Sequence, residues 1–292
     1  MSSSLAPSPA GQRGVPPLPE GFTSHRSDFE GISVHHMEGG SGPPLLMLHG
    51  VGPGTSAFGN FQAILAPLAG RFRIFAPDLV GFGSSGRKQA EPYFDFALWY
   101  RQVRHLLSLM PAGPVAVLGH SLSGALALKL AAHEPRVRHL LTTGTVGTRY
   151  EVTSGLQAIW TFPTSREALR HTLSHLVYDT SHLTDAFLDD RLEVLRQPGY
   201  QSYFEAMFGG DRQRLVESWV LSEEELEAID CRLVMLHGMN DLPCPAEQTT
   251  LRLMNKIKGA DVVLLAECGH SPALEHPHKV LAAMDLLLGA EA

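Results

Sequence analysis

Short apolar runs alternate with longer amphipathic stretches along most of the chain. The apolar runs are four or five residues long and lie at residues 45–48, 72–76, 115–118, 139–143, 233–236 and 262–265. The amphipathic stretches lie at residues 61–68, 94–110, 122–133, 246–257 and 278–288. Strands that are apolar throughout and separated by helices indicate a mostly parallel sheet with helices on both faces. The predicted fold class is therefore α/β.

This alternation stops between residues 149 and 215, where several helix-like patterns occur without a strand pattern. Because open α/β sheets bind ligands at the carboxyl ends of their strands, such an insertion is expected to form a lid over the ligand site. The predicted organisation is a core of residues 22–148 and 216–292 with a helical lid of residues 149–215. Residues 1–21, rich in Ser, Pro and Gly, are expected to form a disordered tail.

Composition narrows the function mainly by exclusion. The chain has 44% hydrophobic and 18% charged residues, which is typical of globular proteins. Its net charge is -7 and it has no cluster of Lys and Arg, which argues against binding to nucleic acid or to an anionic membrane. No apolar run approaches the ~18 residues that span a bilayer, and no secretory signal is apparent. Three cysteines at unrelated spacings favour reduced thiols, so a cytoplasmic location is expected.

Candidate chemistry centres on Ser121 in the stretch VAVLGHSLSGALALKL. An apolar run ends at Gly119 and a helix pattern begins at Leu122, which is the context of a nucleophile on a sharp strand-to-helix turn. The pattern G-x-S-x-G is met except at its last position, where Ser123 replaces glycine. Taken alone, Ser121 is equally compatible with a nucleophile and with a helix N-cap.

Two residues that follow predicted strands complete a triad. Asp241 follows RLVMLHG, and His270 follows DVVLLAECG. A serine nucleophile needs a base to take its proton and a carboxylate to orient that base, and the chain order Ser, Asp, His is that of α/β-hydrolases. The other place for the acid, in TGTVGTRY, has no carboxylate before Glu151.

An oxyanion hole is expected from HGVGPG at residues 49–54, which follows the first apolar run. The N–H groups of Val51 and Leu122 are the predicted donors, and the alternative is a flexible glycine loop. The nucleophile, base, acid and oxyanion donors together predict a serine hydrolase.

Several longer segments resemble the meta-cleavage product hydrolases of bacterial aromatic degradation, which include the 2-hydroxymuconate semialdehyde hydrolases. They are HGVGPGTSAFGNF, FRIFAPDLVGFGSSGR, GHSLSGALAL, HGMNDLPCP, ECGHSPALEHP and the lid stretch LVYDTSHLTDAFLDDRLEVLRQPGYQSYFEAMF. The resemblance covers nearly all of the chain after the tail. It implies an α/β-hydrolase fold and hydrolysis of a C–C bond in a 2-hydroxy-6-oxo-dienoate.

By this resemblance Asn60 lies near the substrate and Arg191 binds the substrate carboxylate. Helical spacing supports Arg191 independently, because it falls within an apolar stripe whose other members are Phe187, Leu188, Leu192, Val194 and Leu195. A cation there needs an anionic partner or a route to water, so a snorkelling side chain or a structural ion pair is the alternative.

Two positions depart from the family pattern. The family commonly has asparagine before the nucleophile and tryptophan after the catalytic histidine, whereas this chain has His120 and Ser271. Both family residues line the substrate site, so His120 and Ser271 are taken as substrate-binding residues. The departures put the substrate in question more than the chemistry.

The expected reaction ketonises the dienol, after which His270 assists Ser121 or a water in attacking the 6-oxo carbon. The partner is then a small molecule carrying a carboxylate, and neither a cofactor nor a metal is expected. Alternatives are a carboxylesterase or lactonase with the same triad, and a ligand-binding protein on a hydrolase scaffold. Assembly into a homo-oligomer is left open.

The remaining motifs do not indicate a further functional site. Residues 81–86 fit G-x-G-x-x-G, but no helix pattern follows, which disfavours a dinucleotide site. The pairs His35–His36, Glu275–His276 and His171–His175 are expected on the surface.

Overall fold

Eight strands form one mixed sheet in the computed structural model, which describes residues 18–289. Their order across the sheet is β1-β2-β4-β3-β5-β6-β7-β8, and only the β1–β2 and β2–β4 pairs are antiparallel. The strands are β1 (Phe22–Phe29), β2 (Ile32–Gly39), β3 (Pro44–Leu48), β4 (Arg73–Pro77), β5 (Val115–His120), β6 (Val137–Thr143), β7 (Arg232–Gly238) and β8 (Ala260–Leu265). The predicted α/β class is confirmed. Residues 1–17 of the predicted tail lie outside the described residues.

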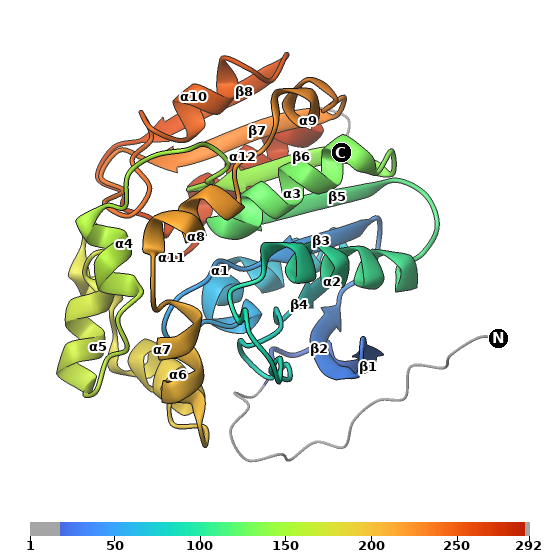
Figure 1. Cartoon of the computed structure of the whole chain (residues 1–292). Helices are drawn as coiled ribbons and strands as arrows, with labels where there is room; N and C mark the ends of the chain where they lie inside the picture. The colour runs from blue at the N-terminus through green and yellow to red at the C-terminus, as the bar shows by residue number, and fades with distance from the viewer. Residues whose placement is uncertain (1–17, 290–292) are drawn as a thin grey trace.

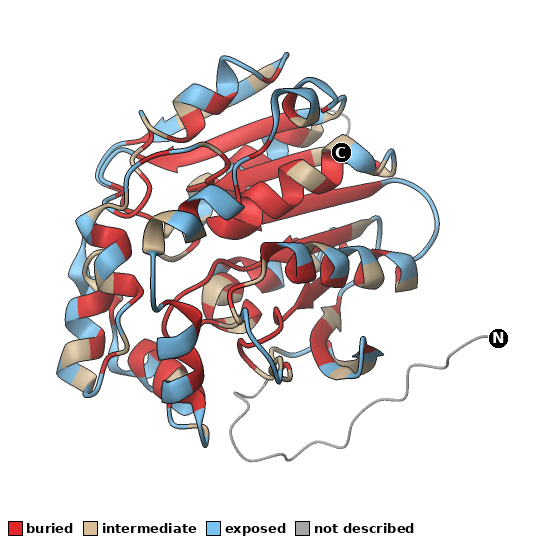
Figure 2. Ribbon diagram, in the orientation of Figure 1, coloured by how far each residue is buried: buried red, intermediate tan, exposed pale blue. Residues whose placement is uncertain are grey.

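Helices cover both faces of this sheet (Figure 1). One face carries α1 (Ala57–Ala69), α11 (Pro272–Glu275) and α12 (Pro277–Leu288). The other carries α2 (Phe96–Leu109) and α3 (Leu122–His133), with α9 (Glu223–Glu227) packed on α3. Each face has its own apolar core, and the central strands between them are buried along almost their whole length (Figure 2). Burial on both faces explains why these strands are apolar without alternation.

Only helices, and no strand of the described chain, lie between β6 and β7. They are α4 (Ser154–Ile159), α5 (Arg166–Leu173), the 3₁₀ turn η1 (Thr180–His182), α6 (Asp185–Leu195), α7 (Tyr200–Met207), α8 (Arg212–Ser218) and α9. Helices α4–α7 gather at one end of the sheet (Figure 1). Hydroxyl side chains cap α4, α5 and α6 at Thr153, Ser165 and Thr184, which is why these short helices begin there. Helix α8 continues three residues past the predicted lid boundary at residue 215.

The sequence patterns missed the hairpin of β1 and β2. Strand β1 is an edge strand of mostly polar residues, FTSHRSDF, and therefore lacks an apolar run. The available signal was the pair Glu30–Gly31. These residues form a two-residue hairpin loop from Phe29 to Ile32, both have positive φ (51° and 78°), and glycine favours such a loop.

Several smaller expectations are corrected. His35 and His36 are 5% and 2% exposed, and Glu275 is 5% exposed, so these are not surface pairs. Their strand and helix partners cover them, which local polarity could not reveal. The helix expected at residues 246–257 is only α10 (Thr250–Met254).

The glycine-rich residues 81–86 form a turn in which the Gly81 N–H donates to the Gly86 carbonyl, 2.9 Å away. The next helix is α2, which begins only at Phe96, so this turn lacks the helix that a dinucleotide site requires. None of the described helices is long and apolar enough to cross a lipid bilayer.

Candidate active site

Ser121 lies at the turn between β5 and α3 with φ 58° and ψ -124°, a conformation that non-glycine residues rarely adopt. Its side chain makes no capping hydrogen bond to α3, which removes the N-cap alternative. A Cβ at Gly119 would lie 2.5 Å from the Ser123 carbonyl oxygen, so this position must be glycine. The strained turn holds the Ser121 hydroxyl away from the helix.

The replacement of glycine by Ser123 is accommodated within the turn. Ser123 is fully buried, and its hydroxyl donates to the His49 carbonyl, 2.5 Å away. The position on the helix side that must be glycine is instead Gly124, because a Cβ there would lie 2.1 Å from Thr145 Oγ1. The departure from the motif therefore adds a bond between the Ser121 turn and the loop after β3.

His270 and Asp241 meet Ser121 in a continuous hydrogen-bonded chain. The distance from Ser121 Oγ to His270 Nε2 is 2.8 Å, and that from His270 Nδ1 to Asp241 Oδ2 is 2.6 Å. All three residues are buried. Because the Asp241 carboxylate can only accept, Nδ1 carries the proton and Nε2 is free to accept from the Ser121 hydroxyl.

The Asp241 carboxylate is also held from its other side. Its Oδ1 accepts the Cys244 N–H at 2.7 Å, and its Oδ2 lies 3.0 Å from His237 Nε2. Burial alone would raise the pKa of Asp241, but the His270 and His237 imidazoles outweigh it and hold that pKa well below its usual range. Asp241 is therefore ionised at neutral pH.

His237 was not singled out from the sequence. It is fully buried at the end of β7, and its Nδ1 lies 2.7 Å from Thr250 Oγ1. The available signal was its place four residues before Asp241, since a histidine at the end of a buried strand needs a polar partner.

The loop after β3 carries the expected oxyanion donors. Asn60 Oδ1 accepts the Gly50 N–H at 2.9 Å, and His49 bridges Gly50 O and Leu79 N at 2.6 and 2.9 Å. A Cβ at Gly50 would lie 2.9 Å from Ser121 Cβ, so the loop passes directly beside the serine. Within residues 18–289, neither the Val51 nor the Leu122 N–H has a protein acceptor. Both are thus free to bind an oxyanion.

Arg191 lies in α6 and is 4% exposed. Its Nη1 donates to Pro53 O at 2.8 Å and to Thr55 Oγ1 at 3.1 Å, which are neutral acceptors, and its Nε has no partner in the described chain. Burial lowers the pKa of Arg191 to about 10, so the guanidinium is still charged at neutral pH. The alternatives of a snorkelling side chain or an ion pair do not match this geometry.

His120 precedes Ser121 and is buried against the base, with its ring centroid 4.9 Å from that of His270. Its Nδ1 is 3.0 Å from Thr143 O, so Nδ1 carries the proton and Nε2 offers a lone pair. Burial lowers the pKa of His120 to about 3 and keeps the ring neutral. Ser271 follows His270 and is the N-cap of α11.

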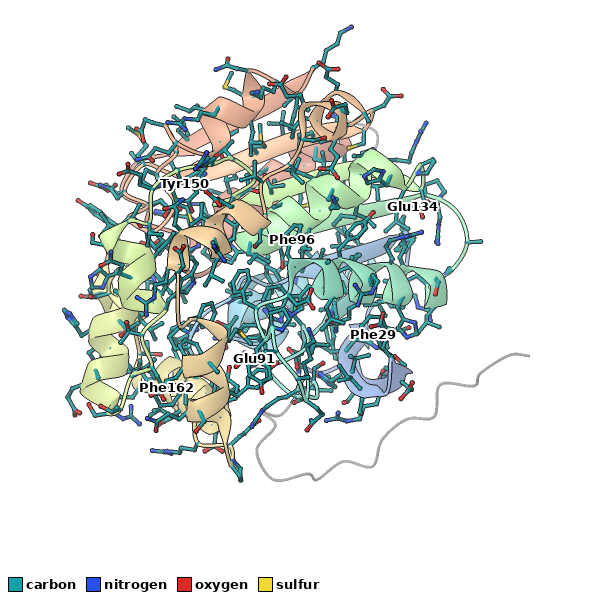
Figure 3. The ribbon with its side chains drawn as sticks, viewed as in Figure 1. Phe29, Glu91, Phe96, Glu134, Tyr150 and Phe162 are labelled. Carbon is teal, nitrogen blue, oxygen red and sulfur yellow. The ribbon has the colours of Figure 1, made fainter. Side chains whose placement is uncertain are left out.

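Seven of the nine predicted site residues line one cavity beneath the lid: Val51, Asn60, His120, Ser121, Arg191, His270 and Ser271. Leu176 from the lid also lines it. Asp241 and Leu122 are not among the lining residues, and Asp241 is bonded to Nδ1 of His270. The cavity volume is about 20 Å³, room for about one water. Phe162 is one of the lid side chains (Figure 3), and its ring centroid lies 5.7 Å from that of Phe204 in α7.

A second Ser–His–Asp chain lies elsewhere. Ser24 Oγ is 2.9 Å from His35 Nε2, and His35 Nδ1 is 2.8 Å from Asp78 Oδ2. Ser24 sits within the regular strand β1, paired with Met37, and not on a turn. Asp78 also accepts the Ala57 N–H at 2.8 Å, which ties this chain to the start of α1.

Comparison with known proteins adds family information to this geometry. Residues 45–283 match the model of the alpha/beta hydrolase family. The chain is 32% identical to the 2-hydroxy-6-oxo-2,4-heptadienoate hydrolase of Pseudomonas putida over 89% of this chain and 94% of that protein. It is also 32% identical to the 2-hydroxymuconate semialdehyde hydrolase of a Pseudomonas species, over 90% and 93% of the two chains.

Solved structures agree with the sequence relatives. A meta-cleavage product hydrolase of Pseudomonas fluorescens, CumD, in complex with acetates, superposes with a TM-score of 0.82 at 30% identity, over 88% of this chain and 94% of that one. Each of these proteins is similar to this chain along nearly its whole described length.

Proposed function

The chain belongs to the alpha/beta hydrolase family, in its branch of meta-cleavage product hydrolases, and on this premise we propose that it hydrolyses a C–C bond in a 2-hydroxy-6-oxo-dienoate. Ser121 is the nucleophile, His270 the base and Asp241 the residue that orients and stabilises the imidazolium. Val51 and Leu122 supply the oxyanion N–H groups, and Asn60, His120, Arg191 and Ser271 contact the substrate.

The observation that carries this proposal is the buried charge of Arg191, which has no anionic partner in the described chain, in the cavity that Ser121 and His270 also line. A buried cation without an anionic partner is costly, because it has lost its hydration without a compensating charge. A substrate carboxylate would supply that charge and would be held at a fixed distance from the serine. The triad therefore accounts for hydrolysis, and Arg191 for an acidic substrate.

The reaction follows from these positions. The bound dienol takes up a proton at C5 as its 2-hydroxyl loses one, and the resulting ketone makes the bond between C5 and C6 cleavable. Ser121 Oγ attacks the 6-oxo carbon while its proton passes to His270 Nε2, and the Val51 and Leu122 N–H groups bind the oxyanion.

Collapse of the oxyanion then breaks the C5–C6 bond. The electron pair released at C5 delocalises to the C2 oxygen as a dienolate, which takes a proton from His270, and a water activated by His270 then hydrolyses the acyl-serine. The products are a 2-hydroxypentadienoate and a carboxylic acid, and the whole reaction consumes one water. No step of this reaction requires a cofactor.

Loss of the yellow dienolate absorbance tests the proposal. We expect the purified protein to bleach at least one ring-cleavage product, such as 2-hydroxymuconate semialdehyde or 2-hydroxy-6-oxo-2,4-heptadienoate. The Ser121→Ala variant is the control. Unchanged absorbance across a panel of such dienoates would contradict C–C hydrolysis.

His120 and Ser271 favour a second candidate, a carboxylesterase or lactonase with the same triad. Ester hydrolysis needs no ketonisation, so it does not depend on the asparagine and tryptophan that these residues replace. Rates with p-nitrophenyl acetate and with a dienoate, measured on one preparation, separate the two. A cytoplasmic location stays a prediction, and assembly into a homo-oligomer stays open.

A further inference from the structure

The Glu275 carboxylate joins the lid to the loop that carries His270. Glu275 ends α11 and is 5% exposed. Its Oε1 accepts the Gly269 N–H at 2.8 Å, and its Oε2 accepts the Tyr178 N–H at 2.6 Å and the Asp179 N–H at 3.4 Å. One side chain thus binds two segments that are about ninety residues apart in the sequence.

The same two segments also touch directly. The His270 N–H donates to the Leu176 carbonyl, 2.9 Å away. A Cβ at Gly269 would lie 2.8 Å from Val177 Cα and 2.9 Å from Leu176 O, so the two backbones pack without intervening side chains. Movement of the lid at residues 176–179 therefore breaks bonds to the catalytic histidine loop.

The chemistry of the contact suits a carboxylate. Within the described chain Glu275 has no ion-pair partner, and its charge is met by backbone N–H groups and, more weakly, by the Cys268 thiol at 3.8 Å. Hydrogen bonds to a charged acceptor are stronger than neutral ones, and a buried charge must be compensated. A carboxylate has two oxygens for these two segments, whereas an amide has one.

The function of this contact follows from the size of the cavity. A volume of about 20 Å³ is far below the roughly 300–1,000 Å³ of ligand pockets, so the lid or its side chains must move to admit a substrate. Leu176, which His270 binds through its backbone, lines that cavity. Closure over a substrate then restores the Glu275 bonds and sets the position of the base.

We propose that Glu275 is a positioning residue that couples closure of the lid at residues 176–179 to placement of His270 against Ser121. This inference rests on the proposed roles of Ser121 and His270 but not on the identity of the substrate.

The test is Glu275→Gln in the full-length protein. Because the amide keeps only one acceptor oxygen, it cannot hold Gly269 and Tyr178 together. We expect amide hydrogen exchange in residues 176–179 and 268–270 to quicken about 10-fold or more. Labelling of Ser121 by a small fluorophosphonate and kcat with p-nitrophenyl acetate should fall about 10-fold, with a smaller change in KM.

Glu193→Gln is the matched control, since Glu193 is exposed on the lid and loses the same charge. Glu275→Asp keeps the charge but shortens the reach, and intermediate effects on both exchange and kcat are expected. Glu275→Asp is also the variant to measure if Glu275→Gln does not fold. Unchanged exchange in both segments overturns the proposal, as does faster exchange with unchanged labelling and kcat, which would make Glu275 a structural anchor.

These readouts are independent of C–C hydrolysis. A wild-type protein that labels at Ser121 and turns over the ester, but leaves every dienoate intact, contradicts the proposed function alone. In that case the effect of Glu275→Gln on hydrogen exchange, labelling and kcat still tests whether Glu275 couples lid closure to the position of His270.

Discussion

At the scale of single residues, Ser24 and Ser121 have similar hydrogen-bonded partners and different backbones. Each begins a chain through a histidine to a buried aspartate, with distances of 2.8–2.9 Å from hydroxyl to imidazole. Only Ser121 lies on a turn with positive φ, beside free N–H groups at Val51 and Leu122. Reactivity needs the stabilised oxyanion as well as the base.

A fluorophosphonate should therefore label Ser121 and not Ser24, as peptide mass spectrometry would show. Ser121→Ala should abolish labelling and lower kcat by roughly 10³-fold or more. Ser24→Ala should leave labelling intact. A phosphonylated peptide containing Ser24 would refute this distinction.

Arg191 should discriminate acidic from neutral substrates. In Arg191→Met the lost charge-assisted bonds, about 1.5–3 kcal/mol, correspond to a rise of roughly 10–150-fold in KM for a dienoate. The same change should alter kcat/KM for p-nitrophenyl acetate only about 3-fold or less. Equal losses with both substrates would show that Arg191 acts on the fold and not on the carboxylate.

Two buried histidines should make the protein sensitive to acid. Burial lowers the pKa values of His36 and His120 to about 3, against an unfolded value near 6.5. Because the unfolded chain binds these protons first, stability is fully present above the unfolded pKa and is lost as pH falls toward 3. Between pH 7.5 and 5.5 each histidine should cost about 1.4 kcal/mol.

The measurement is guanidinium unfolding at both pH values. His36→Phe suits the comparison, because His36 Nε2 has no partner in the described chain and the ring stacks near Phe75, at 6.4 Å. This variant should lose about half of the acid destabilisation that the two histidines cause. An unchanged pH dependence would contradict the assignment to His36.

At the scale of elements, the turn between β5 and α3 is limited by space. A Cβ at Gly119 would meet the Ser123 carbonyl and Ala127 Cβ, so the strand can pass the helix closely enough to hold Ser121 at the apex of the turn only if residue 119 has no side chain. Ser123 and Gly124 on the helix side then fix the turn against His49 and Thr145.

Gly119→Ala should destabilise the protein by about 1–3 kcal/mol, as overpacking of a close contact does. Gly70→Ala is the matched control, because Gly70 has φ -66° at the end of α1 and its Cβ would meet nothing closer than 3.5 Å. It should be neutral or stabilise by about 0.4–1 kcal/mol. Thermal or chemical unfolding measures both, and a stable Gly119→Ala variant would contradict the packing account.

At the scale of the whole molecule, the cavity between lid and core has a volume of only about 20 Å³, so binding depends on motion of the residues that line it. The central strands are buried between two helical layers. The lid packs on the core through apolar contacts, such as those of Trp160 and Phe208 with Phe94, and through polar ones, such as those of Arg191 and Glu275, but it also borders the cavity through Leu176. Motion is therefore expected at the lid and not within the sheet.

Stopped-flow mixing of Ser121→Ala with a dienoate should show an observed rate that reaches a plateau as concentration rises, because lid movement then limits binding. Added glycerol should lower that plateau. A rate that rises linearly to high concentration would show that the cavity opens without a slow step.

The order and type of the central elements follow from the sequence alone. Six apolar runs predicted β3 to β8. Strands β3 to β7 carry such runs because the middle of the sheet is buried on both faces, whereas β8 is an edge strand that keeps the run VVLL although it is only partly buried. Ser121, Asp241 and His270 were identifiable because each follows such a strand. Strands β1 and β2 were not identifiable in this way. The edge strand β1 is mostly polar, and β2, although buried between β1 and β4, carries His35 and His36 where an apolar run would stand.

Only the tertiary structure decided which polar groups meet. His237 beside Asp241, Glu275 between the lid and Gly269, and the lack of an anion at Arg191 are relations between segments far apart in the chain. Hydrophobic periodicity is read from residues that are close in the sequence, and it indicates which side chains of one element face the core. The partner of a buried polar atom depends on how separate elements pack, so it is determined only when the chain has folded.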